Sequence, residues 1–143
     1  MIIDSQNQFS SAQAVTSMGS TASTNAIDLG ANRDIGGAVT DQLMLLCEVV
    51  TPFTSGGSAT LQVQFQTSAD NSAWSTLAQS DAIPVASLVQ GYKFLPGELP
   101  GPTQRFLRLN YVVGTAAMTA GALKAALVPS LDVQPVYARG YAA

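Results

Sequence analysis

The chain has 143 residues, a length that favours one domain with enough interior to fold without a metal or disulfide staple. Hydrophobic residues make up 47% of it and charged residues only 10%, which excludes a disordered composition. Because few charges cover the surface, we expect part of it to lie against another protein. A compact monomer with a neutral polar surface is the alternative.

The charges argue against nucleic acid and membranes as partners. The formal net charge is −3, and the basic residues are scattered, whereas binding to phosphates needs clustered cations. The longest apolar run, Leu43 to Cys47, is far shorter than the ~20 residues of a membrane span. Asp4 stands where a signal peptide carries a base. We expect a protein made in a reducing cytoplasm, with Cys47, the only cysteine, as a buried and inert thiol.

The first part of the chain predicts an arm. Residues 1–22 show neither a helical nor a clean strand period, and their apolar points are Ile2, Ile3 and Phe9. This pattern is typical of an extended segment that packs on a neighbour or stays loosely tethered. A short strand is predicted over 24–29, and the glycines of 30–37 predict a loop.

Two strong strand signals follow. Residues 43–51 are apolar on both faces, which predicts a central strand or one whose outer face is covered, ending at Pro52. In 59–67, Leu61, Val63 and Phe65 alternate with glutamines, so one face is apolar and the other carries amides. The turn-forming residues 68–72 and a returning strand from Trp74 complete a β-hairpin.

The last third predicts more strands and a second arm. Residues 92–95 form a short strand candidate, three prolines interrupt 96–102, and 105–113 alternate again. Residues 115–128 are ambiguous: their alanines favour helix, whereas Leu123, Ala125 and Leu127 at a spacing of two favour strand. We choose strand because 105–113 needs a partner in an otherwise all-β chain. Residues 130–143 are predicted to be a C-terminal arm.

Together these elements predict an all-β fold, an antiparallel β-sandwich of jelly-roll type with extended N- and C-terminal arms. The predicted boundaries are 1–22 for the first arm, 23–129 for the sandwich and 130–143 for the second arm. An open barrel with a ligand cavity is the alternative architecture.

Catalytic chemistry is not indicated. The chain contains no histidine, which removes the commonest general base and most catalytic zinc sites. The loop from Asp28 to Asp34 spaces oxygen ligands like a calcium site but has Arg33 where the turn glycine belongs, so a polar turn is preferred. Trp74, Tyr92 and Tyr111 are candidates for a sugar-stacking platform, with core packing as the preferred interpretation. We predict no enzyme, no cofactor and no metal.

Three segments carry a family resemblance. The opening MIIDSQNQFSSAQAVTS, the stretch from Ser23 to Gly30 and the strand and turn from Val63 to Trp74 resemble the capsid cement, or decoration, proteins of short-tailed bacteriophages. The type member of that family comes from a Bordetella phage. The resemblance implies a jelly-roll protein on the outer surface of an icosahedral shell of HK97-like major capsid protein, where it stabilises contacts between capsomers.

The resemblance also implies partners: the major capsid protein and other copies of this chain, with a dimer favoured and a trimer possible. A glycan- or receptor-binding module of a phage tail or a secreted protein is the competing function. The apolar and aromatic residues of the two arms, with one arginine, are the predicted inter-subunit or capsid contacts: Ile2, Ile3, Phe9, Val136, Tyr137, Arg139 and Tyr141.

Overall fold

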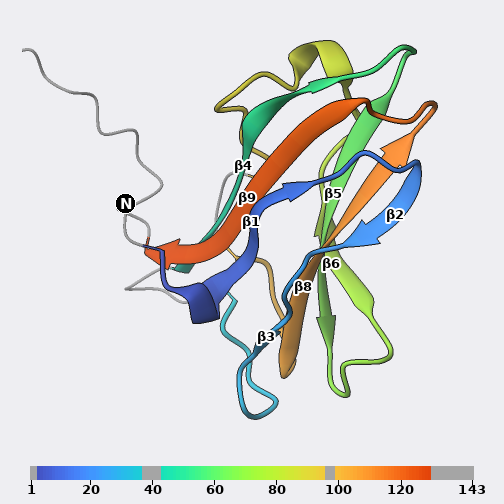
Figure 1. Cartoon of the computed structure of the whole chain (residues 1–143). Helices are drawn as coiled ribbons and strands as arrows, with labels where there is room; N and C mark the ends of the chain where they lie inside the picture. The colour runs from blue at the N-terminus through green and yellow to red at the C-terminus, as the bar shows by residue number, and fades with distance from the viewer. Residues whose placement is uncertain (1–2, 37–42, 96–98, 130–143) are drawn as a thin grey trace, which may run out of the picture.

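The computed structural model describes residues 3–36, 43–95 and 99–129, which form two antiparallel sheets packed face to face (Figure 1). The smaller sheet has the order β1-β9-β4, with β1 at Gln8–Ala14, β9 at Ala120–Pro129 and β4 at Leu43–Thr54. The larger sheet has the order β2-β8-β5-β6, with β2 at Gly19–Ala22, β8 at Phe106–Gly114, β5 at Thr60–Ser68 and β6 at Ser75–Gln79. Two short strands extend the larger sheet, β3 (Ile27–Asp28) on β8 and β7 (Ile83–Pro84) on β5. The described 3-10 helices are η1 (Ser5–Asn7) and η2 (Val85–Ser87).

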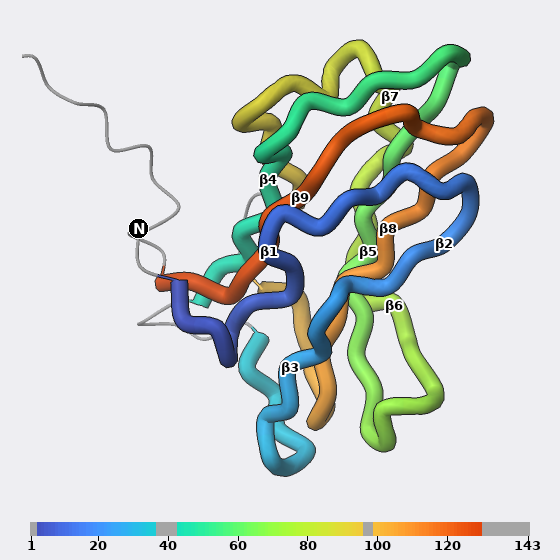
Figure 2. Tube along the Cα trace, in the orientation of Figure 1, coloured from blue at the N-terminus to red at the C-terminus, as the bar shows by residue number. Residues whose placement is uncertain are grey.

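The path of the chain is that of a jelly roll. It crosses from β1 in the smaller sheet to β2 in the larger one, and later from β4 to β5 and β6 (Figure 2). It then returns beside β4, where Lys93 bridges Glu48 and Phe94 N–H donates to the Cys47 carbonyl at 2.8 Å. β8 and β9 repeat the crossing. With the Lys93 segment, each sheet has four principal members, as a jelly roll requires.

The strand predictions are largely confirmed. The alternation in β5 does place Leu61, Val63 and Phe65 in the core, each with no exposed surface. The ambiguous segment 115–128 is mostly strand, because β9 begins at Ala120. The reason for that choice, a pairing with 105–113, is wrong, since β9 pairs with β1 and β4 and not with β8. The predicted strand at 92–95 is reduced to the single bridge at Lys93.

The predicted N-terminal arm is wrong for residues 8–22. β1 pairs with β9, β2 pairs with β8, and Phe9 is fully buried with its ring edge-on to Phe65 at 6.3 Å. The sandwich therefore begins at β1 and not at residue 23. The physical reason is irregularity: Ala12 has a φ of 51° and β1 shifts register twice against β9, which hides the period of two.

β4 also continues past the predicted stop at Pro52. The strand shifts register between Val49 and Thr51 and again between Thr51 and Thr54, and the second irregularity accommodates the proline, after which Phe53 re-enters the core. Phe53 packs directly on Gly121, whose φ is 139° and where any Cβ would clash with the phenyl ring. A glycine in β9 is therefore required by the path of β4.

A buried hydroxyl network fastens β1 to the opposite sheet. Ser10 Oγ lies 2.7 Å from Tyr111 Oη and donates to Gln13 Oε1 at 2.7 Å. Gln13 Oε1 also accepts from Thr24 N–H, and Gln13 Nε2 donates to the Ala22 carbonyl. Since Tyr111 belongs to β8, the network links the two sheets through the interior.

The core position of Phe65 gives a stability prediction. Phe65→Ala should lower the free energy of unfolding by about 3–5 kcal/mol, because it removes a fully buried ring and leaves a cavity. Urea denaturation measures the change. Val89→Ala, at a residue with 58% of its surface exposed, is the control and should change it by less than about 0.5 kcal/mol. Equal effects of the two variants would contradict this core.

The hydroxyl network gives a second prediction. Tyr111→Phe should lower the free energy of unfolding by about 0.5–1.5 kcal/mol, because the ring still fits but Ser10 loses a buried hydrogen-bond partner. Amide exchange in β1 should accelerate together with the loss in urea stability. Tyr92→Phe is the matched control, because it keeps the ring contact with Phe94 and removes a hydroxyl that bonds to no described residue. If β1 exchanges at the same rate in both variants, the network does not hold that strand.

Candidate interaction surfaces

The outer face of the smaller sheet carries a second apolar cluster. Leu46, Ala126 and Val128 point away from the main core, yet each is at most 1% exposed, and Ile3 packs against them. We call these four residues the outer apolar cluster. β4 and β9 are therefore apolar on both faces, as the sequence of 43–51 predicted. Burial on the inner face raises the pKa of the Cys47 thiol, as expected for an inert cysteine.

A short row of charges borders the outer apolar cluster. Glu48 and Lys124 are paired across β4 and β9, with Glu48 Oε1 2.8 Å from Lys124 Nζ. Both side chains are partly exposed. Lys93 is the neighbour of Glu48 on the other side, so two lysines flank one glutamate in this row. The face thus combines buried apolar contacts with charges that remain accessible.

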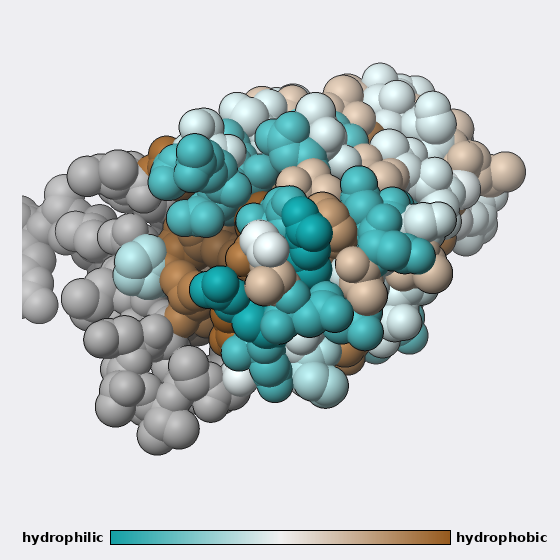
Figure 3. Space-filling model, turned by 90° about the horizontal axis from the view of Figure 1, so that it is seen from below, coloured by the Kyte–Doolittle hydropathy of each residue, from teal (hydrophilic) through white to brown (hydrophobic). Residues whose placement is uncertain are grey.

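The first and last described residues lie on this side of the molecule. Ile3 packs on the cluster, and Pro129, the end of β9, is opposite Leu43 at the start of β4. Figure 3 shows apolar surface concentrated on the side where β4 begins and β9 ends, while most of the visible face is polar. The two described ends of the chain, Ile3 and Pro129, therefore lie on the side of the outer apolar cluster.

The predicted contact residues divide into three groups. Ile3 lies on the outer face of the smaller sheet, packed against the outer apolar cluster, and its role as a contact stays a prediction. Phe9 is a core residue, so its prediction as a contact is wrong: its ring is enclosed by the two sheets. The remaining predicted contacts lie outside the described residues: Ile2, Val136, Tyr137, Arg139 and Tyr141.

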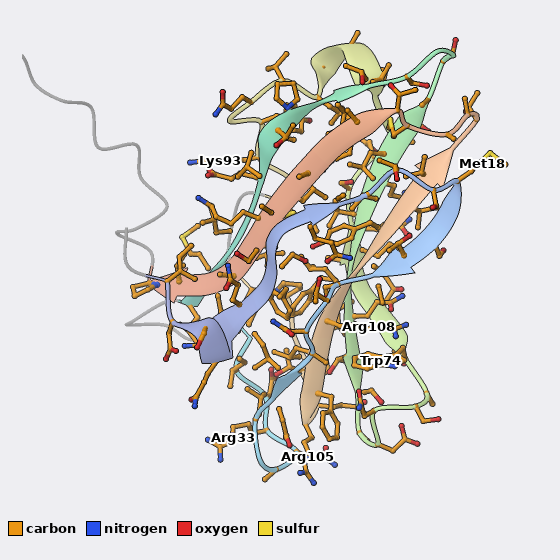
Figure 4. The ribbon with its side chains drawn as sticks, viewed as in Figure 1. Met18, Arg33, Trp74, Lys93, Arg105 and Arg108 are labelled. Atoms are coloured by element: carbon orange, nitrogen blue, oxygen red, sulfur yellow. The ribbon has the colours of Figure 1, made fainter. Side chains whose placement is uncertain are left out.

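The outer face of the larger sheet is polar and connected by hydrogen bonds. Gln64 Oε1 accepts from Asn110 Nδ2 at 2.9 Å and from Gln66 Nε2 at 3.3 Å. Gln66 Oε1 in turn accepts from Arg108 Nε at 2.8 Å. The Arg108 guanidinium lies 4.1 Å from the centre of the Trp74 ring, a cation–π contact (Figure 4). Sequence alternation predicted the amide face but not the arginine stacked on tryptophan.

The three aromatic residues proposed for sugar stacking do not gather. Tyr111 is in the core, Trp74 is on the outer face of the larger sheet, and Tyr92 packs edge-on against Phe94. Core packing is thus confirmed for Tyr111 but not for Trp74. Tyr92 helps to line an open cavity of about 370 Å³ between the end of β6 and the Lys93 segment. The cavity is lined by Gln79, Ser80, Asp81, Ile83, Tyr92, Lys93, Phe94 and Leu95.

The loop from Asp28 to Asp34 is a polar turn. Asp28 accepts from Gly30 N–H, Asp34 accepts from Gly36 N–H and Thr103 N–H, and Asn32 accepts from Arg105 N–H. These oxygens hold the backbone of the loop. Within the described ranges, no three His, Cys, Asp or Glu residues group as a metal site would require, and no helix is long and apolar enough to cross a membrane.

Fold and surfaces define a small all-β jelly-roll protein with one partly apolar and one amide-rich outer face. The family model named Bbp16 matches residues 9–127, and the chain belongs to this family of Bordetella phage proteins. The match starts in β1 and ends in β9, so it spans the two-sheet core that the structure shows. No curated protein matches the chain.

The ion pair at the lower end of the larger sheet makes stability pH-dependent. Arg105 bonds Asp28 through Nε at 2.8 Å, and this bond, with that from Gly30 N–H, lowers the pKa of Asp28 to about 2. A lowered carboxyl pKa stabilises the fold above the unfolded pKa and loses this effect as the pH falls toward 2. The stability difference between the protein and Asp28→Asn should therefore be constant near neutral pH and shrink below about pH 4. Urea titrations at several pH values test this, and a constant difference down to pH 2 would contradict the assignment.

Proposed function

We propose that this protein is a structural component of a phage virion, a capsid cement protein. It binds the outer surface of an icosahedral head of HK97-like major capsid protein and stabilises contacts between capsomers. Membership of the Bbp16 family supports a phage protein. The observation that supports cementing is the outer face of the smaller sheet, where the outer apolar cluster meets both described ends of the chain.

This geometry suits a protein that joins neighbours. Ile3 and Pro129 lie on the same side of the sandwich. If that side rests on the shell, the segments before residue 3 and after residue 129 both start next to the shell and can contact it. Each apolar anchor buried in a neighbour stabilises the contact by roughly 1.5–3 kcal/mol. In a symmetric shell the contact repeats with every copy, so modest contacts add up through multivalency.

We also propose that the chain associates with itself, as a dimer in preference to a trimer. β6 is an edge strand of the larger sheet, and its residues 75–79 contain no charge and no proline. Charges and prolines are the usual protection of an edge against pairing. Light scattering on the purified protein should therefore give the mass of a dimer at tens of micromolar, roughly the range in which small edge contacts associate. A stable monomer would count against this proposal.

The second candidate function is a glycan- or receptor-binding module. Its specific support is the amide-rich outer face of the larger sheet with Arg108 on Trp74. The two functions use opposite outer faces of the sandwich, so variants of one face need not affect the other.

Binding to shells tests the cement function. Ile3→Asp should sharply reduce co-sedimentation with heads stripped of this protein, because it places a charge on the outer apolar cluster. Val89→Asp is the matched control, the same kind of change at an exposed apolar residue outside the cluster, and should bind as the unmodified chain does. Deleting 131–143 should weaken binding in the same way while the cooperative thermal transition stays. Deleting 1–20, in contrast, should unfold the protein, since it removes β1.

Two outcomes would contradict the proposal. If Ile3→Asp and the 131–143 deletion both bind stripped heads as tightly as the full chain, the smaller sheet is not the docking face. If Val89→Asp loses binding as strongly as Ile3→Asp, the effect of an added aspartate is not specific to the cluster.

A further inference from the structure

Arg108 occupies an unusual position on the outer face of the larger sheet. Within β2, β5, β6 and β8 it is the only charged residue, and Asp28 of the short strand β3 on the same sheet is already paired with Arg105. The neighbours of Arg108 on that face are mostly amides and hydroxyls, with Val112 and Phe106 as partly buried apolar members of β8. The polar neighbours are Gln62, Gln64, Gln66, Thr76, Gln79 and Asn110. A cation in a neutral field of hydrogen-bonding groups is a specific feature of this surface.

The guanidinium is held in place but not neutralised. Its Nε donates to Gln66 Oε1, and its plane rests on Trp74. No described residue accepts from Nη1 or Nη2, and Arg108 makes no ion pair within the described ranges. Arg105, three residues earlier and just before β8 begins, is different because its Nε and Nη2 both donate to the Asp28 carboxylate. Asp70, in the nearby hairpin turn, is occupied by the N–H groups of Ser72 and Ala73.

An arginine in this state is prepared to receive a carboxylate. The free Nη1 and Nη2 edge offers two parallel donors, which match the two oxygens of a carboxylate group. The side chain does not have to be ordered on binding, because Gln66 and Trp74 already fix it. Partial burial lowers the pKa of Arg108.

The surroundings favour an acidic saccharide over a protein carboxylate. A protein interface needs an apolar centre, whereas the centre of this face is made of amides around one indole, with Val112 and Phe106 on either side along β8. Amides offer donors and acceptors to sugar hydroxyls: Asn110 Oδ1 and Gln62 Oε1 accept from no described residue, and Gln79 Nε2 donates to none. Trp74, which is partly exposed, supplies the aromatic surface for the C–H groups of a sugar ring.

We propose that Arg108, Trp74 and the adjoining amides form a binding site for a saccharide with a carboxylate group, such as a uronic acid. The carboxylate binds the Nη edge of Arg108, and the hydroxyls bind Asn110 and the glutamines of β5. The site does not depend on the cement function, because it lies on the other sheet. If the smaller sheet rests on a shell, this face points away from it.

The test uses the full chain and three probes: a galacturonate oligosaccharide, a neutral galactose oligosaccharide of the same length, and a short polyglutamate. Isothermal titration should show saturable binding of the galacturonate alone. Arg108→Gln should weaken it about tenfold or more, because a charge-assisted bidentate bond is lost. Arg33→Gln is the matched control, since it removes the same charge from an exposed arginine outside this face, and should leave binding unchanged.

A second variant guards against a folding artefact. Trp74→Leu should also weaken galacturonate binding while leaving the thermal transition intact, because Trp74 is only partly buried. No binding of galacturonate to the unmodified chain overturns the proposal, as does equal loss in Arg33→Gln. Binding of polyglutamate that equals galacturonate and needs Arg108 overturns it in favour of a protein carboxylate. If the neutral oligosaccharide binds as tightly as the galacturonate oligosaccharide, the carboxylate is not recognised and the proposal is overturned.

Discussion

The antiparallel pair of β4 and β9 is apolar on both faces, and the rest of the structure depends on this constraint. The inner face, with Cys47 and Leu123, closes the core against the larger sheet. The outer face cannot be left to water, because Leu46, Ala126 and Val128 are large enough together to need a cover. Ile3 supplies part of it. A sandwich that would otherwise have polar outer faces thus acquires one side with a covered apolar cluster, the side on which we propose that a partner docks.

The two outer faces differ in physical character, and this difference separates the two proposals. The outer face of the smaller sheet carries a covered apolar cluster bordered by two lysines and one glutamate, and the proposed docking on a shell uses this side. The larger sheet offers ordered amides and one unneutralised arginine, a combination suited to a small polar ligand. Since the sheets pack against each other through their inner faces, a protein docked by one still presents the other (Figure 1).

Regular strands were predictable from the sequence, and irregular ones were not. Alternation located β5 and β8 because these two strands pair with each other along their whole length without a register shift. It missed β1, since the positive φ at Ala12 moves the following side chains to the other face. The surfaces were only partly predictable for a similar reason. The covered outer face of β4 could be predicted, because residues 43–51 are apolar at both odd and even positions. The contact of Arg108 with Trp74 could not, because it joins residues far apart in sequence.

Lysine footprinting on intact phage particles tests the central claim most directly. The chain has lysines only at 93 and 124, and both belong to the charged row on the outer face of the smaller sheet. An amine-reactive reagent should modify both in the isolated protein, and mass spectrometry should find both protected in the particle. Protection of this kind is what docking of that face on the shell predicts. If both lysines react in the particle as fast as in the isolated protein, the smaller sheet faces solvent and the account is contradicted.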